Sequence, residues 1–332
     1  MSEAVSGGPV PPASNTPVPV APLSLSWRGH RIAWTRCGES DPSRPAVVLL
    51  HGFGASIGHW RHTLPALAPH AEVFALDLLG FGASDKPRSR LDGEEGPPDA
   101  VRYCFDLWGA QVADFVSGVV LAAGGRPVHL IGNSIGGIVA LAAARQLLER
   151  GLAPAQVVLI DCAQRTLDQK RVAELPVWEQ AGRPVLRCLV RQRWLLAPLF
   201  RLLARPMVVR QVLRQAYPSG ANVDDALVSL LLRPAADAGA LESFRGFVNL
   251  FDDHLAPTLM QGLPLPVRLL WGRDDPWEDP AEAARWRDQL PCIQELRVLP
   301  GLGHCPHDEA PELVNPILIE WLHATAGAMT PA

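Results

Sequence analysis

Short, largely apolar runs recur along the chain, each followed within two residues by a glycine or an aspartate. They are AVVLL from residue 46, VFAL from 73, VHLI from 128, VVLI from 157, VRLLW from 267 and LRVL from 296. Apolar runs of about four to eight residues are typical of strands buried on both faces of a parallel sheet. The pattern therefore predicts a sheet built mainly from parallel strands.

Amphipathic segments of helical length separate several of these runs, beginning after residues 105, 136 and 311. Strands that alternate with helices predict a doubly wound α/β sheet. Ahead of the first run, apolar and polar residues alternate on both sides of Arg28 and Gly29. This alternation predicts a β-hairpin at the start of the ordered domain.

The alternation of strands and helices stops between residues 164 and 260, where helical patterns follow one another without a convincing strand. We interpret residues 164–260 as a helical cap inserted into a sheet domain of residues 24–163 and 261–324. Residues 1–23 are rich in proline, alanine, serine and glycine, which predicts a disordered leader. We expect residues 325–332 to form a flexible tail.

Composition narrows the function classes. The 332 residues are 48% hydrophobic and 19% charged, with a net charge of −4, which gives no overall basic field for nucleic acid. The six cysteines are scattered without a C-x-x-C pair, so neither a disulfide scaffold nor a zinc site is indicated. No run of about 20 apolar residues predicts a spanning helix. We expect a cytoplasmic protein, with peripheral membrane contact left open.

A candidate nucleophile lies where an apolar run meets a helical pattern. Gly132, Asn133, Ser134, Ile135 and Gly136 form a G-x-S-x-G string between the two. A nucleophile elbow needs this strand-turn-helix context, with small residues that let strand and helix pass close together. The string also arises by chance in glycine-rich sequences. Its context makes Ser134 the candidate nucleophile.

A glycine-bearing turn, His51–Gly54, follows the run that begins at residue 46. An oxyanion hole needs two backbone donors, and the candidates are the N–H groups of Phe53 and Ile135. The alternative is an ordinary turn in which His51 is only a packed histidine. We expect the next turn, Asp77–Asp85, to have an architectural role.

Two later turns supply the other members of a triad. Asp275 follows the run from residue 267 and His304 follows the last run. The chain order serine, aspartate, histidine is that of the α/β-hydrolase fold, and all three turns fall at the carboxyl ends of predicted strands. We predict that Ser134 is the nucleophile, His304 the general base and Asp275 the acid that orients it.

Three residues compete for these roles. Asp274 adjoins Asp275, and Asp161 occupies a position where some members of the fold carry the acid. We prefer Asp275 because the pattern of the α/β-hydrolase fold places the acid three residues after the glycine, and we expect Asp161 near the hinge of the cap. His307 competes with His304, which the preceding glycine favours.

The chain resembles the α/β-hydrolase superfamily over about residues 24–324, with a mostly parallel, doubly wound sheet and an inserted helical cap. The strings FDLW from residue 105, GNSIGG from 132, DPW from 275 and GHCPHDE from 303 are most similar to the pheophytinase and chlorophyll dephytylase group of plants and cyanobacteria. One departure is His51, where the plant enzymes have proline.

The resemblance implies a serine ester hydrolase that needs no metal or organic cofactor. Its implied substrate is a bulky lipophilic ester such as the phytyl ester of a chlorophyll-type pigment. Two alternatives stay open: a C–C bond hydrolase or haloperoxidase-type enzyme with the same triad, and a non-catalytic receptor that binds a ligand in the capped pocket.

The cap is basic. Residues 165–214 contain eleven lysines and arginines against three acidic residues, a net charge of +8, so the rest of the chain carries −12. Apolar residues interleave with arginines between 184 and 205, which is typical of an interfacial helix on anionic lipid. The alternative, which we prefer at this stage, is a lid helix whose apolar face covers the active site and whose arginines are solvated.

Overall fold

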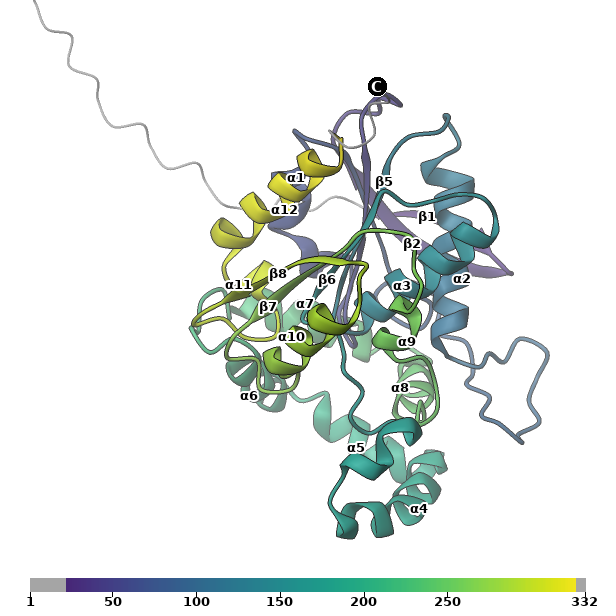
Figure 1. Ribbon diagram of the computed structural model, residues 1–332. Helices are drawn as coiled ribbons and strands as arrows, with labels where there is room; N and C mark the ends of the chain where they lie inside the picture. The colour runs from purple at the N-terminus through teal and green to yellow at the C-terminus, as the bar shows by residue number, and fades with distance from the viewer. Residues whose placement is uncertain (1–21, 327–332) are drawn as a thin grey trace, which may run out of the picture.

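The computed structural model of the protein describes residues 22–326. Nearly all of the predicted leader and most of the predicted tail lie outside the described residues. One mixed sheet of eight strands runs through the middle of the molecule (Figure 1). The strands are β1 (Leu23–Trp27), β2 (His30–Cys37), β3 (Ala46–Leu50), β4 (Glu72–Leu76), β5 (Val128–Asn133), β6 (Gln156–Ile160), β7 (Val267–Gly272) and β8 (Ile293–Leu299).

All six apolar runs predicted as strands are strands of this sheet, and β3 to β8 are parallel to one another, whereas β2 pairs antiparallel with β4. The first two strands form the predicted antiparallel hairpin. Its turn residues Arg28 and Gly29 have φ angles of 51° and 82°. Positive φ at both central residues is the geometry of the two-residue turn that matches strand twist.

The strand order β1-β2-β4-β3-β5-β6-β7-β8 places β3 between β4 and β5. After β3 the chain first adds β4 on one side and later crosses to add β5 on the other. Open α/β sheets bind their ligands at such a reversal, beyond the carboxyl ends of the strands. The turn after β3 and the turn after β5 both lie at that point, which places His51 and Ser134 there.

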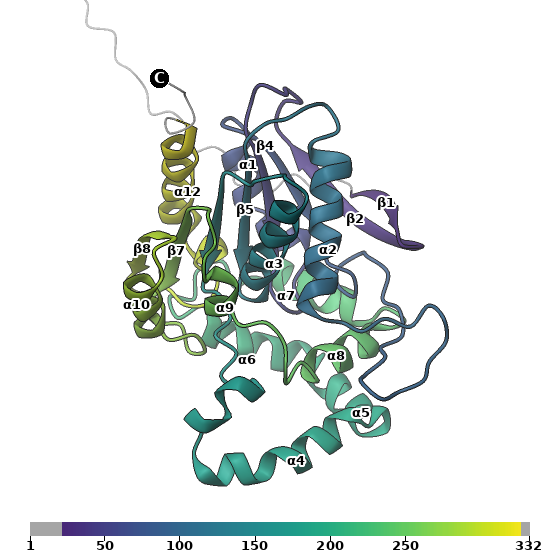
Figure 2. The same cartoon turned by 45° about the vertical axis from the view of Figure 1, so that its right-hand side comes forward.

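Helices cover both faces of the sheet (Figure 2). On one face, α2 (Phe105–Phe115), α3 (Ile135–Glu149), α9 (Ala256–Met260) and α10 (Pro280–Gln289) share the larger hydrophobic core, and α2 continues as a π-helical turn, Val116–Val120. On the other face, α1 (Thr63–Leu67) and α12 (Pro311–Ala326) cover the smaller core. Successive strand residues alternate between the two cores, because strand side chains alternate between the faces of a sheet.

The described chain between β6 and β7 is helical, as its periodicity predicts. It contains a 3₁₀ helix (Gln169–Glu174), α4 (Val177–Arg191), α5 (Arg193–Leu203), α6 (Pro206–Ala216), α7 (Asp225–Ala235), α8 (Ala240–Val248) and α9. Of these, α9 packs into the core of the sheet domain. No helix within residues 22–326 is both long and apolar enough to cross a membrane.

The orientation of α4 differs from the expected lid helix. Arg183 is its one buried residue, and the guanidinium groups of Arg183 and Arg187 lie over the ring of Phe251. The apolar side chains of the helix are exposed instead. The expectation that its apolar face packs inwards is therefore wrong for α4, because Phe251 offers a cation–π surface to the arginine face.

Candidate active site

Ser134 forms the sharp junction between β5 and α3. Its backbone has φ 56° and ψ −123°, outside the regions that a serine normally adopts. Three backbone hydrogen bonds hold this conformation. Ser134 N donates to the Ile160 carbonyl at 3.0 Å, and its own carbonyl accepts from Gly137 N at 3.0 Å and Ala163 N at 3.2 Å. The surrounding backbone thus fixes a strained serine, as expected of residues at functional sites.

Two glycines make the junction sterically feasible. A Cβ atom on Gly132 would overlap the carbonyl of Gly136, and one on Gly136 would overlap the carbonyl of Leu50. The strand, the helix and the end of β3 therefore meet at van der Waals distance without side chains between them. Ser134 itself is only 9% exposed. This is the close approach that the G-x-S-x-G string predicts.

The turn after β3 lies against this serine. A Cβ atom on Gly52 would stand 3.2 Å from the Cβ of Ser134. The N–H groups of Phe53 and Ile135, the two predicted oxyanion donors, have no hydrogen-bond acceptor within the described part of the chain. Unpaired backbone N–H groups next to the serine are available to bind an anionic oxygen.

His51 serves this turn as a structural residue. Its Nδ1 lies 2.8 Å from the carbonyl oxygen of Gly52, and Leu78 N donates to its Nε2 at 3.1 Å. The imidazole is therefore neutral with its proton on Nδ1, and burial lowers its pKa further. Asp77 accepts from two backbone N–H groups of neighbouring turns, at 2.6 and 2.7 Å. Its position fits the architectural role that the sequence predicts.

The predicted base and acid are hydrogen-bonded to each other. His304 Nδ1 and Asp275 Oδ2 are 2.8 Å apart. The other carboxylate oxygen of Asp275 accepts from Trp277 N at 2.9 Å and Glu278 N at 3.2 Å. The Trp277 ring meets the imidazole edge to face at 4.9 Å. The acceptor for His304 is thus Asp275 and not Asp274.

Asn133 connects the serine turn to the histidine loop. Its amide Nδ2 donates to the His304 carbonyl at 3.0 Å. From the other side, His304 N donates to the carbonyl of Ala216, at the end of α6 in the cap. The sequence places Asn133 in the elbow, but its contact with His304 spans 171 residues and has no local signal.

The residues after His304 anchor the segment of the cap between α6 and α7. One carboxylate oxygen of Glu309 accepts from the N–H and the hydroxyl of Ser219, and the other accepts from Gly303 N. Asp308 accepts from the hydroxyl of Tyr217 at 3.0 Å and from Arg61 Nε at 2.8 Å. The string GHCPHDE therefore ties the loop of His304 to the cap.

The competing histidine has a different environment. His307 is fully buried, its ring lies 4.3 Å from Trp60 and 4.7 Å from His59, and neither ring nitrogen has a partner within residues 22–326. Burial lowers its pKa well below the usual range. A neutral histidine held by aromatic contacts packs the core and does not face an acid.

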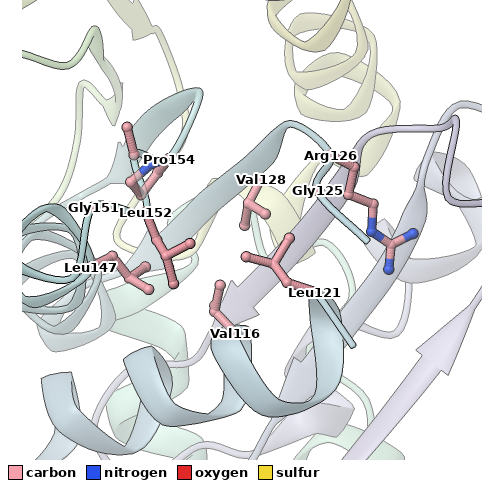
Figure 3. A pocket seen from close by; sticks show the side chains of 10 residues that line it. Val116, Leu121, Gly125, Arg126, Val128, Leu147, Gly151, Leu152 and Pro154 are labelled. Atoms are coloured by element: carbon pink, nitrogen blue, oxygen red, sulfur yellow. The ribbon is translucent and has the colours of Figure 1, made fainter. Parts of the chain in front are cut away.

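Two pockets lie elsewhere on the molecule. The first, of about 160 Å³, is lined by residues that include Leu121, Val128 and Leu152 (Figure 3). Val128 begins β5, so this pocket is at the opposite end of that strand from Ser134. The second, of about 700 Å³, adjoins the β1–β2 turn and the start of α2. Neither is lined by a residue of the predicted triad.

Comparison with known proteins assigns the chain to a family. The model of the alpha/beta hydrolase family matches residues 47–317. The chain belongs to the α/β-hydrolase family. The resemblance and the fold expected from the sequence are thereby confirmed.

Several individual proteins are similar to this α/β-hydrolase. It is 26% identical to the chloroplastic pheophytinase of Arabidopsis thaliana over 90% of this chain, which spans 65% of that protein. It is also 26% identical to the 2-hydroxy-6-oxo-6-(2'-aminophenyl)hexa-2,4-dienoic acid hydrolase of Metapseudomonas resinovorans, covering 84% of this chain and 83% of that one. A membrane phospholipase A of bacterial origin shares the fold, with a TM-score of 0.68, 23% identity and coverage of 92% and 87%.

A second carboxyl group lies beside the acid of this α/β-hydrolase. Asp161, fully buried at the end of β6, accepts from Gly272 N at 2.9 Å through one oxygen. Burial and the adjacent charge of Asp275 raise its pKa well above the usual range. The surroundings of Asp161, beside the His304–Asp275 pair, therefore favour its protonated form.

The close approach at the elbow can be tested by adding a methyl group. Gly136→Ala forces that group against the Leu50 carbonyl, so we expect a loss of unfolding free energy of about 2 kcal/mol or more, or failure to fold. Gly118→Ala, whose added Cβ meets nothing within 4 Å, should change stability by less than about 1 kcal/mol. Urea unfolding measures both. Equal effects of the two changes would contradict the close approach.

The second prediction separates the two acids. Asp161→Asn replaces a carboxyl, whose protonated form is favoured, with a neutral amide of the same shape, so we expect kcat/KM to stay within about ten-fold of wild type. Asp275→Asn removes the charge that orients His304 and should lower kcat by about 10³ to 10⁴-fold. Ester hydrolysis by the two purified variants is the measurement. The reverse order of effects would make Asp161 the functional acid.

The third prediction follows from Glu278, whose pKa burial raises to about 8. The unfolded chain ionises this carboxyl above its ordinary pKa while the folded chain keeps it protonated, so the residue costs stability increasingly as pH rises from about 5 to 8. Glu278→Gln should therefore gain stability over wild type with rising pH, by at most about 1.4 kcal/mol per unit. Urea unfolding of both proteins across this pH range measures how the difference in unfolding free energy changes with pH. A difference that is independent of pH would contradict it.

Proposed function

We propose that this protein is a serine carboxylic-ester hydrolase that acts through an acyl-enzyme intermediate. One observation carries the proposal: a strained, buried Ser134 lies against the turn after β3, and Asn133 beside it bonds to the loop of the His304–Asp275 pair. These are the parts of a nucleophile elbow, an oxyanion hole and an oriented base.

The mechanism assigns one role to each part. His304, whose Nδ1–H donates to Asp275, takes the proton of the Ser134 hydroxyl on its other ring nitrogen as Oγ attacks the ester carbonyl. The N–H groups of Phe53 and Ile135 stabilise the oxyanion, each worth on the order of 3 kcal/mol. The imidazolium then protonates the departing alcohol. Water repeats the sequence, and the carboxylic acid is released.

The surroundings of the oxyanion turn favour a lipophilic substrate. Phe53 stacks on Phe247 of α8 with centroids 3.9 Å apart, and its ring edge meets Phe81 at 5.7 Å. Its side chain is nevertheless 39% exposed. An apolar aromatic wall between core and cap suits a bulky hydrocarbon chain better than a charged group.

The relatives support two candidate substrates. Similarity to a pheophytinase favours the phytyl ester of a chlorophyll-type pigment. Similarity to the Metapseudomonas resinovorans hydrolase favours cleavage of a C–C bond next to a carbonyl with the same triad. Ester hydrolysis is our first choice, because the resemblance extends to the GHCPHDE string that anchors the cap.

A substrate panel tests this proposal, our fourth prediction. Wild type should hydrolyse short p-nitrophenyl esters, long acyl esters and pheophytin, and Ser134→Ala should lose about 10⁴-fold or more in kcat. Ser43→Ala, a change at an exposed serine, is the matched control and should keep wild-type rates.

The outcomes separate the alternatives. Activity confined to short esters would remove the pigment from the proposal. Cleavage of a vinylogous 1,5-diketone but of no ester would establish C–C hydrolysis. Failure of the wild type to react with a fluorophosphonate probe would favour a ligand-binding receptor.

A further inference from the structure

Helix α4 presents its apolar side to solvent. Val177 is 80% exposed and Trp178 is 74% exposed, and Val185 and Leu189 continue the same exposed strip. Trp178, Val185 and Leu189 lie on one side of the helix. Trp178 and Val185 are about two helical turns apart, and Val185 and Leu189 are about one turn apart. Arg183 and Arg187, on the opposite side, face Phe251.

This apolar surface extends onto the next helices. Of the 16 large apolar side chains that are exposed in the described residues, 12 lie between Leu167 and Val212. Trp194 of α5 and Met207 of α6 are among the most exposed, at 72% and 81%. Concentration of exposed apolar groups in one region marks an interaction surface, whereas single exposed groups are ordinary.

The same region is strongly basic. Residues 177–214 contain eight arginines and one acidic residue, Glu179. Arg201, Arg205 and Arg214 are exposed and have no carboxylate partner in the part of the chain that the structure describes. Apolar and tryptophan side chains with arginines beside them are the composition of a helix that lies in the surface of an anionic bilayer.

Charge decides between a membrane and a second copy of the chain. Pairing two caps face to face would bring the exposed Arg201, Arg205 and Arg214 of one copy towards those of the other, and like charges in contact are costly. Anionic phospholipid supplies the opposite charge and an apolar layer to receive Trp178 and Leu189. The place of α4 and α5, at the end of the molecule farthest from α12, leaves them accessible to a flat surface (Figures 1 and 2).

We therefore propose that α4 and α5 dock the protein onto the surface of an anionic phospholipid bilayer. The exposed apolar strip of α4 lies among the headgroups and upper acyl chains, and the arginines at the end of α5 bind lipid phosphates. This docking goes beyond the proposed hydrolysis and does not depend on it.

Vesicle co-sedimentation tests the proposal. We expect the full chain to bind phosphatidylcholine vesicles that contain about 30% phosphatidylglycerol at least ten-fold more tightly than pure phosphatidylcholine, and to be released by salt. Trp178→Glu with Leu189→Glu should weaken binding by about ten-fold or more. Leu313→Glu, at an exposed apolar residue of α12, is the matched control and should bind as wild type.

A second pair of variants tests the charge. Arg201→Glu with Arg205→Glu should lose about ten-fold or more in affinity for the anionic vesicles. Arg285→Glu with Arg287→Glu makes the same change in charge on α10, outside the cap, and should retain most of the binding. Thermal unfolding of each variant establishes that it is folded.

Some results would overturn the docking. These are equal affinity for neutral and anionic vesicles, no binding to either, or equal losses in the cap and control variants. A concentration-dependent dimer that the α4 variant abolishes would assign the surface to a second copy instead. Ser134→Ala should bind vesicles as wild type does, so failure of docking and failure of the proposed catalysis are distinguishable.

Discussion

The close packing of β5, α3 and the end of β3 around Ser134 is the constraint on which the rest of the site depends. Without side chains at Gly132 and Gly136, the strand and helix approach until the serine has no relaxed conformation available. The strain is maintained by hydrogen bonds from β6 and its following loop. That geometry puts the Ile135 N–H at a helix N-terminus, where an anion is favoured. It also places the serine beside the turn after β3.

The histidine loop is held by the elbow and by the cap together. Asn133 binds the carbonyl of His304, while Ala216 of α6 accepts from its N–H. Asp308 and Glu309 extend this contact to Tyr217 and Ser219. The position of the imidazole therefore depends on the cap being in place.

The sequence predicts those features that depend on local pattern. Apolar runs identify the parallel strands, and the strand-turn-helix context identifies the elbow, because both are encoded by neighbouring residues. The order of the turns and their places at strand ends also predict the pairing of His304 with Asp275, which the structure shows as a hydrogen bond. The environment of the buried Asp161 and the bond between Asn133 and His304 depend on contacts between distant segments, which no local pattern encodes. Amphipathicity predicts that α4 is a helix but not which face is buried, since that is decided by Phe251, more than 60 residues away.

Covalent acylation of Ser134 is the central claim for this α/β-hydrolase, and trapping the intermediate tests it most directly. The protein is mixed with a slowly hydrolysed p-nitrophenyl ester, quenched in acid within the first turnover, and digested for peptide mass spectrometry. The account predicts an acyl group on the peptide that contains Ser134, formed at the rate of p-nitrophenol release and absent after longer incubation. Release of p-nitrophenol with the acyl group on another residue, or with no adduct at any time, would contradict it.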